Sequence, residues 1–330
     1  MSQDKFASAN SCWDTKKRIS VTIGGNLAAF SESSNWLATA ATRGKQIHLR
    51  ARDGRENATE PAQPPYHYER LIDVNSTAAL GFRAEQNIAT DNGETFKLQR
   101  QELLVADCRA SLIRRYLPGI GHLKPIEVAQ PTALANDASG RWLACGGSDG
   151  RVTLFDLNSI NGPLAVARSA AGKAAITKLV FTSCNRQICG LYGDGTALII
   201  ELGWGIASGN LSTVNNLRVK NGQLFALAAH RSCRQIVLAG EGPTWLCNLE
   251  NNETSTLETQ LGNYVYFAQF LSGNELLLAG EKGLELHKIA AAAQPGESEK
   301  QSLIWHLSLV PATKLVALHE SEQELIMAVH

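Results

Sequence analysis

Four glycines recur in this chain at nearly constant spacing, and each lies between two short apolar segments. They are Gly150, Gly195, Gly242 and Gly283, which are 45, 47 and 41 residues apart. Glycine tolerates a positive φ and therefore permits the tight turn of a β-hairpin. The flanking segments, rich in Leu, Ile and Val, predict a strand on each side of every turn. The chain is thus predicted to repeat one hairpin-based unit.

A repeat of this length is typical of β-propellers, whose blades are four-stranded sheets of about 40–45 residues. A single small sheet cannot bury both of its faces, so successive sheets must pack face to face around an axis. The predicted fold class is all-β: a seven-bladed propeller of residues 18–330. The second blade is placed on 77–82, 102–106 and 111–117. Eight blades are the alternative, because the segment 83–100 is either a long hairpin loop or an additional, poorly formed blade.

The two ends of the chain are expected to meet in the last blade. Three strands are predicted there, at 304–309, 314–317 and 324–327. An exposed strand edge invites unwanted pairing, so the segment 18–23 is expected to supply the missing outer strand and to close the ring. Residues 1–17 remain as an N-terminal tail. The Pro-rich stretch 53–66 is predicted to be an irregular loop between blades.

The stretch from Gly121 to Asp156 carries a more specific motif. It begins with Gly121-His122, turns at Gly147-Ser148-Asp149-Gly150 and ends with Phe155-Asp156. In these features it resembles the WD-repeat (WD40) family of β-propellers, with phenylalanine where that family usually has tryptophan.

In the WD-repeat family a His, a turn Asp, a Ser or Thr and the Trp form a hydrogen-bonded chain that stiffens each blade. The resemblance implies that His122 pairs with Asp149, but Phe155 lacks the indole N–H, so the chain is incomplete. The next repeat keeps the turn acid as Asp194. The resemblance thus implies a structural role, not a catalytic one, for His122, Asp149, Phe155, Asp156 and Asp194.

A second, finer resemblance concerns the run 23–28, the abbreviated second repeat and the last two repeats. They are similar to the first propeller of tandem-propeller WD proteins in the U3 small nucleolar RNP, the small-subunit processome. This similarity implies a role in ribosome small-subunit assembly and a nuclear or nucleolar location.

The charges of the chain balance, with 31 Lys and Arg against 31 Asp and Glu. Proteins that bind nucleic acid through its phosphates usually carry a basic excess, so we do not expect direct nucleic-acid binding, although an RNA-containing complex stays open. The N-terminus lacks a secretory apolar core and no run reaches ~18 apolar residues. We therefore expect an intracellular protein without a membrane partner, cytoplasmic unless the processome resemblance holds. The seven scattered cysteines are expected to be reduced.

The sequence contains no recognisable catalytic motif. Gly119-Ile120-Gly121 lacks the third glycine of a dinucleotide loop, and the turn at Ser148 is one residue short of a serine elbow. We expect no enzymatic activity, no cofactor and no metal. A propeller enzyme stays as an alternative, because a central channel assembles a site from one residue per blade without a linear motif.

The leading expectation is a non-catalytic scaffold that holds other proteins within a multi-subunit assembly. The alternative among binding functions is a non-catalytic partner subunit of an RNA-modifying enzyme. Aromatic and arginine side chains are the usual anchors of protein interfaces. The candidates are Tyr66, His67 and Tyr68 beside the Pro-rich loop, and Arg114, Arg115 and Tyr116 near a blade end. Alternatively, the tyrosines pack between loops, and the arginines belong to a solvated face.

Overall fold

The computed structural model describes most of the 330-residue chain. The described residues are 17–31, 33, 35–52, 66–83, 86–89, 95–98, 101–118, 120–159, 162–172, 174–182, 186–218, 223–230, 235–251, 253–289, 301–307, 314–320 and 324–330. Nearly all of the predicted tail and of the predicted Pro-rich loop lies outside these residues. No helix in the described part of the chain is long and apolar enough to cross a bilayer.

The protein is an all-β fold made of several small antiparallel sheets. The first sheet holds β2 (Leu27–Phe30), β3 (Trp36–Ala40), β4 (Gln46–Arg52) and β5 (Tyr66–Asp73). The second holds β6 (Thr77–Phe82), β9 (Leu103–Asp107), β10 (Leu112–Leu117) and β11 (Gly121–Glu127). Between β6 and β9, β7 (Gln86–Ala89) and β8 (Thr95–Leu98) form a two-stranded hairpin. The described part of the segment 83–100 therefore contains a two-stranded hairpin, and the number of blades stays a prediction.

The next eight strands form one sheet with two four-stranded halves. The first half is β12 (Pro131–Asn136), β13 (Trp142–Gly147), β14 (Val152–Asp156) and β15 (Leu164–Ser169). The second is β16 (Ile176–Phe181), β17 (Gln187–Tyr192), β18 (Thr196–Glu201) and β19 (Asn210–Arg218). A short parallel pairing of β15 with β19 joins the halves, beside the six-residue helix α2 (Gly203–Ser208).

Three further sheets complete the described fold. One holds β20 (Leu224–Ala229), β21 (Gln235–Gly240), β22 (Thr244–Asn248) and β23 (Thr254–Leu257). The next holds β24 (Val265–Phe270), β25 (Glu275–Gly280), β26 (Gly283–Ile289) and β27 (Gln301–Leu307), with a 3-10 turn at Ser272–Asn274. The last holds β28 (Leu315–Glu320), β29 (Glu324–Val329) and β1 (Lys17–Thr22).

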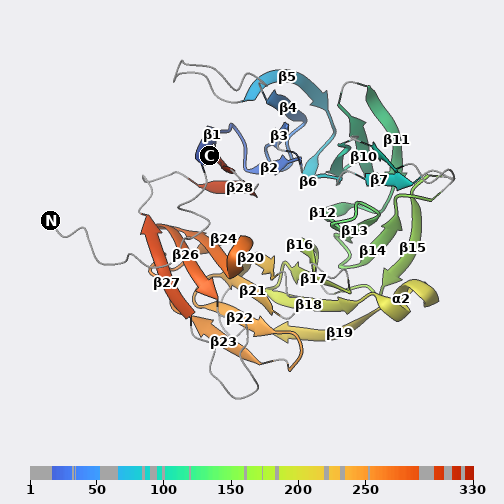
Figure 1. Cartoon of the computed structure of the whole chain (residues 1–330). Helices are drawn as coiled ribbons and strands as arrows, with labels where there is room; N and C mark the ends of the chain where they lie inside the picture. The colour runs from blue at the N-terminus through green and yellow to red at the C-terminus, as the bar shows by residue number, and fades with distance from the viewer. Residues whose placement is uncertain are drawn as a thin grey trace.

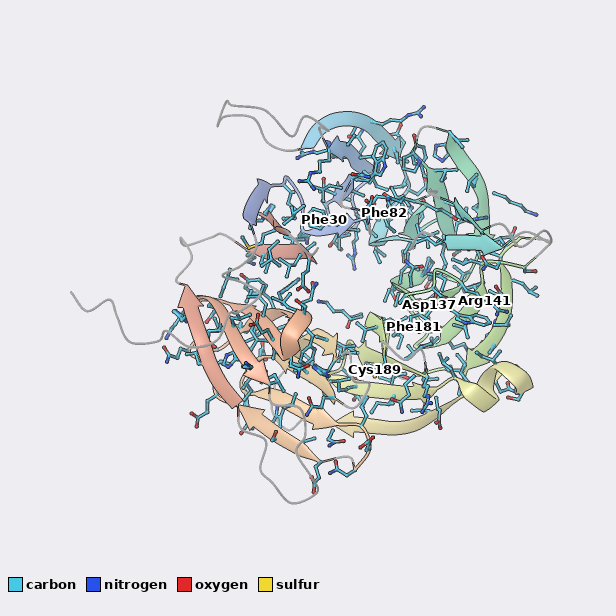
Figure 2. The ribbon with its side chains drawn as sticks, in the orientation of Figure 1. Phe30, Phe82, Asp137, Arg141, Phe181 and Cys189 are labelled. Atoms are coloured by element: carbon cyan, nitrogen blue, oxygen red, sulfur yellow. The ribbon has the colours of Figure 1, made fainter. Side chains whose placement is uncertain are left out.

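The sheets fan around a common axis, as in a β-propeller (Figure 1). The first strand of each lies nearest the axis, and these strands contact one another in chain order from β2 to β28. Phe30, Phe82 and Phe181 end three of them and lie near the central opening (Figure 2). Each packs against the apolar cluster shared with the preceding sheet. A common position in the repeat thus has a common packing role.

A β-bulge recurs near the beginning of the first strands, which also marks the sheets as copies of one unit. The pairing with the second strand shifts register at this point in β6, β12, β16, β20, β24 and β28. A bulge bends a strand and increases its twist. The repeated bulge therefore gives successive sheets the same bend near the axis.

The core is divided into apolar clusters at the junctions between neighbouring sheets. Leu154 and Ile200 meet between the two halves of the eight-stranded sheet. Leu246 and Leu278 meet at a later junction, and Leu37 with Ile326 joins the last sheet to the first. Strands such as β13, β21 and β25 are buried on both faces, which explains why they read as continuous apolar runs.

The four predicted turn glycines all adopt the backbone conformation that the hairpins require. Their φ angles are 73° at Gly150, 82° at Gly195, 85° at Gly242 and 147° at Gly283. Gly150, Gly195 and Gly242 lie between the second and third strands of their sheets, and Gly283 is the first residue of the third strand β26. The repeat inferred from glycine spacing is confirmed at these turns.

The predicted allocation of strands to the last sheet is wrong by one strand. The segment expected at 304–309 belongs to β27, which pairs with β26 as the outer strand of the preceding sheet. β28 and β29 are then the first and second strands of the last sheet. The error arose because the long connection 290–300 resembles a linker between sheets, whereas it joins two strands of one sheet.

The N-terminal segment pairs in the last sheet, but in an unexpected position. β1 runs parallel to β29, from Lys17 opposite Glu324 to Thr22 opposite Val329. It was expected as an outer strand after three others, and it lies instead directly beside the second strand.

Candidate functional site

Asp149 and Asp194 occupy the same position in two hairpin turns. The Asp149 Oδ1 accepts the N–H of Arg151 at 3.0 Å, and the Asp194 Oδ1 accepts the N–H of Thr196 at 3.0 Å. Asp149 also lies 3.5 Å from the guanidinium of Arg151, and both side chains are about half exposed. These carboxylates fix the turns that join second and third strands.

The pairing of His122 with Asp149 that the family resemblance implied is not formed. No hydrogen bond joins these two described residues. His122 is exposed at the beginning of β11 and meets the Tyr116 ring edge-on, with centroids 5.4 Å apart. The turn that contains Asp149 lies at the other end of β11, where the N–H of Ser148 donates to the carbonyl of Gln130. The length of β11 therefore separates the two side chains.

Asp137 organises a different turn, and the sequence reading missed it. It is buried between β12 and β13, and its carboxylate accepts the N–H of Trp142 at 2.7 Å and the N–H of Ser139 at 3.2 Å. Ser31 and Thr182 accept in the same way from the residue five positions ahead. The signal was a short polar residue directly after each first strand.

Phe155 and Asp156 end the third strand of this sheet. Phe155 is buried in the cluster shared with the second sheet. Asp156 accepts two hydrogen bonds from Arg141, at 2.9 and 3.1 Å, and Arg141 covers the ring of Trp142. Burial alone would raise the pKa of Asp156, but the bonds from Arg141 and from the N–H of Asn158 lower it below its ordinary value. Both residues thus make contacts within the fold, and their predicted structural role stays a prediction.

Arg114, a predicted docking residue, is engaged inside the protein. Its Nε donates to the buried Asp107 at 2.7 Å. Asp107 also accepts the N–H groups of Asn75, Ser76 and Ala110. Burial would raise the pKa of Asp107, but these donors outweigh burial and hold the pKa below its usual range. Asp107 thus ties the hairpin after β9 to the loop before β6.

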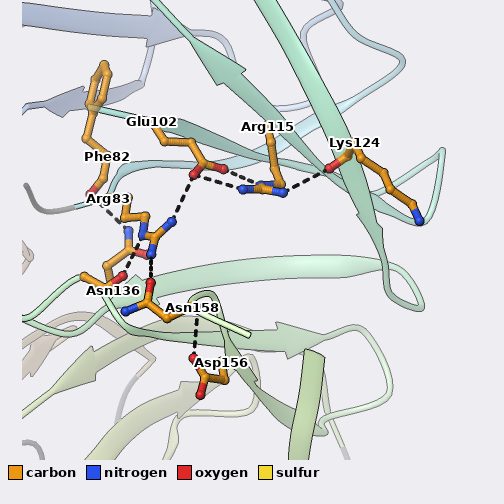
Figure 3. A network of polar contacts seen from close by, with 9 residues as sticks. Phe82, Arg83, Glu102, Arg115, Lys124, Asn136, Asp156 and Asn158 are labelled. Atoms are coloured by element: carbon orange, nitrogen blue, oxygen red, sulfur yellow. Dashed lines mark hydrogen bonds and ion pairs between the residues drawn. The ribbon is translucent and has the colours of Figure 1, made fainter. Parts of the chain in front are cut away.

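Arg115 belongs to a charged network between the second and third sets of strands (Figure 3). Glu102 accepts from Nε and Nη2 of Arg115 and lies 3.4 Å from Nη1 of Arg83. Arg83 continues across the junction: its Nε donates to the carbonyl of Gly140 at 2.6 Å, and its Nη2 donates to Asn158. The Glu102 side chain is only 5% exposed, and those of Arg83 and Arg115 are 13% and 12% exposed. The network therefore joins two sheets.

Of the remaining predicted docking residues, the structure describes the side chain of Tyr116 only. Tyr116 is buried and accepts a hydrogen bond from Arg70 Nη1 at 2.8 Å, which links β10 to β5. Tyr66, His67 and Tyr68 pair with β4 through their main chain, and their side chains lie outside the description. A docking role for these six residues stays a prediction.

A second buried charged cluster lies on the outer strands β26 and β27. Glu285 Oε2 lies 2.8 Å from His287 Nε2, and Oε1 lies 3.3 Å from His306 Nδ1. The N–H of Gln260, in the connection between β23 and β24, donates to Oε1 at 2.6 Å. Burial would raise the pKa of Glu285, but His287, Gln260 and His306 lower it. In the sequence the signal was an acid at an interior position of an apolar run.

The lowered pKa of Glu285 predicts a loss of stability in acid. In the range between its ordinary pKa of 4.5 and the lower folded value, the unfolded chain binds more protons than the folded chain. Stability is therefore present above pH 4.5 and is lost as the pH falls through the folded pKa. We expect Glu285→Gln to cost about 2 kcal/mol at pH 7 and to weaken the loss of stability between pH 5 and 3, as measured by urea denaturation. An acid dependence as steep as in the wild type contradicts this assignment.

The described cysteines are thiols, as expected. Cys145, Cys189 and Cys247 are buried and Cys108 is half-buried. Burial raises the pKa of Cys247 to about 12, and burial together with the charge of Asp149 raises that of Cys145 to about 12. The thiolate is the reactive form, so these two thiols are inert in the folded protein.

Thiol labelling tests this inertness. At pH 8 we expect iodoacetamide to leave Cys145 and Cys247 unmodified in the native protein and to modify both in urea, as measured by peptide mass spectrometry. Cys108 is the internal comparison and is expected to label first. Rapid native labelling of Cys145 would contradict its burial.

Two hollows open on the outside of the sheets. One, of about 600 Å³, is lined by Lys45, His48, Arg50 and Asp73 among others. The other, of about 560 Å³, is lined by Glu127, Asp149, Arg151 and Arg168 among others. Within the described residues no group of three or more His, Cys, Asp or Glu side chains is placed to hold a metal ion.

The comparisons with known proteins add no relative to this picture. No protein-family model matches the chain, and no curated protein matches it.

Proposed function

We propose that the chain is a seven-bladed, WD-type β-propeller that serves as a non-catalytic scaffold within a larger assembly of proteins. The observation that carries the proposal is the succession of first strands around the axis. β28 contacts both β24 and β2, so that each sheet has a neighbour on either side. In the proposed ring, β1 and β29 join the two ends of the chain.

Contacts between the sheets support the proposal that the fold is a rigid frame. The Arg83–Glu102–Arg115 network and the Arg70–Tyr116 bond each connect different sheets, and the Gln260–Glu285 bond ties the connection between β23 and β24 to β26. A rigid frame that displays turns on its two faces is suited to recognition, because binding then orders little of the chain.

Exposed apolar side chains support the proposal that the partners are proteins. Ile120 is 67% exposed and Leu164 is 56% exposed. They lie at the turns from third to fourth strand in successive sets of strands, so the repeated strand direction places both turns on the same side of the fold. Apolar anchors on one side suit a protein surface.

The finer part of the proposal is a role in ribosome small-subunit assembly, with a nuclear or nucleolar location. It rests on the resemblance of the run 23–28 and of the second and last repeats to processome propellers.

Affinity purification of the tagged full-length protein, followed by mass spectrometry, tests both parts. We expect a defined set of proteins to co-purify, and the double variant Ile120→Asp/Leu164→Asp to reduce their recovery at least about tenfold, since each lost apolar anchor costs about 1–2 kcal/mol. Leu303→Asp is the matched control, because Leu303 is 42% exposed on a distant sheet. Absence of any co-purifying protein refutes the scaffold. Partners without ribosome-assembly factors refute only the finer part.

A further inference from the structure

The last sheet contains fewer strands than its neighbours. It holds β28, β29 and β1 in that order, whereas the sheets on either side hold four strands each. Within the described chain, no strand pairs with the outer side of β1. The sheet also reaches less far from the axis than those of β2–β5 and β24–β27 (Figure 1).

The direction of β1 also indicates that the last sheet lacks a strand. In the other sets of four strands, the third strand runs antiparallel to the second and the fourth runs parallel to it. β1 is parallel to β29 and therefore has the direction of a fourth strand, but it occupies the third position. Within the described chain no strand pairs with its outer edge, and the main-chain groups of an unpaired edge template a further strand.

A basic hollow lies at the C-terminal end of β1. Gly24 and Gly25, just after β1, line the 600 Å³ hollow together with Lys45, His48 and Arg50. Asp73 is its one acidic residue in the described chain, and it accepts a hydrogen bond from Gln46 at 3.4 Å. The lining therefore has a net positive charge.

The third strands of other sheets differ from β4, whose side chains line this hollow. Phe155 on β14 and Ile200 on β18 face the preceding sheet and are buried against it. The residues of β4 on the corresponding face are His48 and Arg50, which are half-buried and line the hollow. A charged face thus replaces an apolar one beside the shortened sheet.

We propose that the edge of β1 and this hollow receive an extended acidic segment of a partner protein, which adds to the last sheet as a further strand. Main-chain groups of β1 pair with the segment, and its acidic side chains meet Lys45, His48 and Arg50. The six residues of β1 offer an edge of roughly 20 Å at about 3.3 Å per residue. This inference deepens the proposed scaffold role and rests on it.

Binding of two fluorescein-labelled ten-residue peptides to the full-length protein tests the inference. One peptide alternates Glu with Val, and the other alternates Lys with Val. By fluorescence anisotropy we expect the acidic peptide to bind at least about tenfold more tightly, and more weakly as salt is added. We expect Lys45→Glu/Arg50→Glu to abolish this preference. Arg151→Glu is the matched control, because Arg151 lines the other hollow.

Hydrogen exchange locates the peptide. We expect the amides of 17–22 that face away from β29 to exchange in the free protein and to be protected by the acidic peptide. Equal binding of both peptides, or protection elsewhere, overturns the inference. If the amides along both edges of β1 are already protected in the free protein, the inference is also wrong, because the chain then covers its own edge. If affinity purification yields partners that Lys45→Glu/Arg50→Glu retains, the inference fails while the scaffold stands; if it yields none, the scaffold itself fails.

Discussion

Replacing Glu102 with glutamine is expected to lower the free energy of unfolding by about 3–5 kcal/mol. Glu102 is the one carboxylate that contacts both Arg83 and Arg115 within the described network, and all three side chains are largely buried. Glutamine keeps the shape but removes the negative charge, which leaves two guanidinium groups close together and poorly solvated. Removing one partner of a buried ion pair is costly for this reason. Urea denaturation followed by tryptophan fluorescence measures the change.

Glu127→Gln is the matched control for this experiment. Glu127 lies on β11, in the same sheet, but its side chain is exposed. We expect its replacement to change stability by less than about 0.5 kcal/mol. Equal effects of the two substitutions would show that Glu102 does not hold the two arginines in the folded protein.

Replacing Gly240 with alanine is expected to destabilise the protein by about 3 kcal/mol. A Cβ atom at Gly240 would lie 2.0 Å from the carbonyl oxygen of Gln223 and 2.7 Å from the Cα of Leu224. Both atoms are main chain at the beginning of β20, next to its bulge, so no side-chain rotation relieves the clash. The pairing of β20 with β21 must open instead. Thermal or urea unfolding measures the loss.

Gly203→Ala is the control for the glycine experiment. Nothing lies within 4 Å of a Cβ atom at this position, the first residue of α2. Alanine is the better helix former by up to about 1 kcal/mol, so stability should stay the same or rise slightly. A loss at Gly203 as large as at Gly240 would mean that the close approach to Gln223 is not the cause.

The candidate site could be predicted only where the chemistry was local. Asp149 and Asp194 were found from the turn motif, since each carboxylate caps an N–H two residues ahead. The pairing of His122 with Asp149 was wrong, because it required positions at opposite ends of β11 to meet. Asp137 was overlooked, although an acid three residues before a turn glycine is a local signal.

Buried charges were the larger omission. Glu102 directly precedes the apolar run 103–106 and Glu285 stands between two leucines. A buried carboxylate is costly unless it is paired, so these positions could have marked both. The residues that pair with these two carboxylates could not be predicted from the sequence. Arg83 lies 19 residues before Glu102 and beyond an inserted hairpin, and Gln260 reaches Glu285 from the connection between two sheets.

The sequence by itself determined the repeated hairpin and the all-β class, because glycine turns and apolar strands depend on contacts between residues a few positions apart. The tertiary structure alone decided that β27 completes the sheet of β26, that β1 lies parallel to β29, and which charges meet between sheets. The physical reason is that strand pairing and ion pairing are selected by burial against neighbouring sheets. Two segments with the same local pattern acquire different partners once the sheets are packed around the axis.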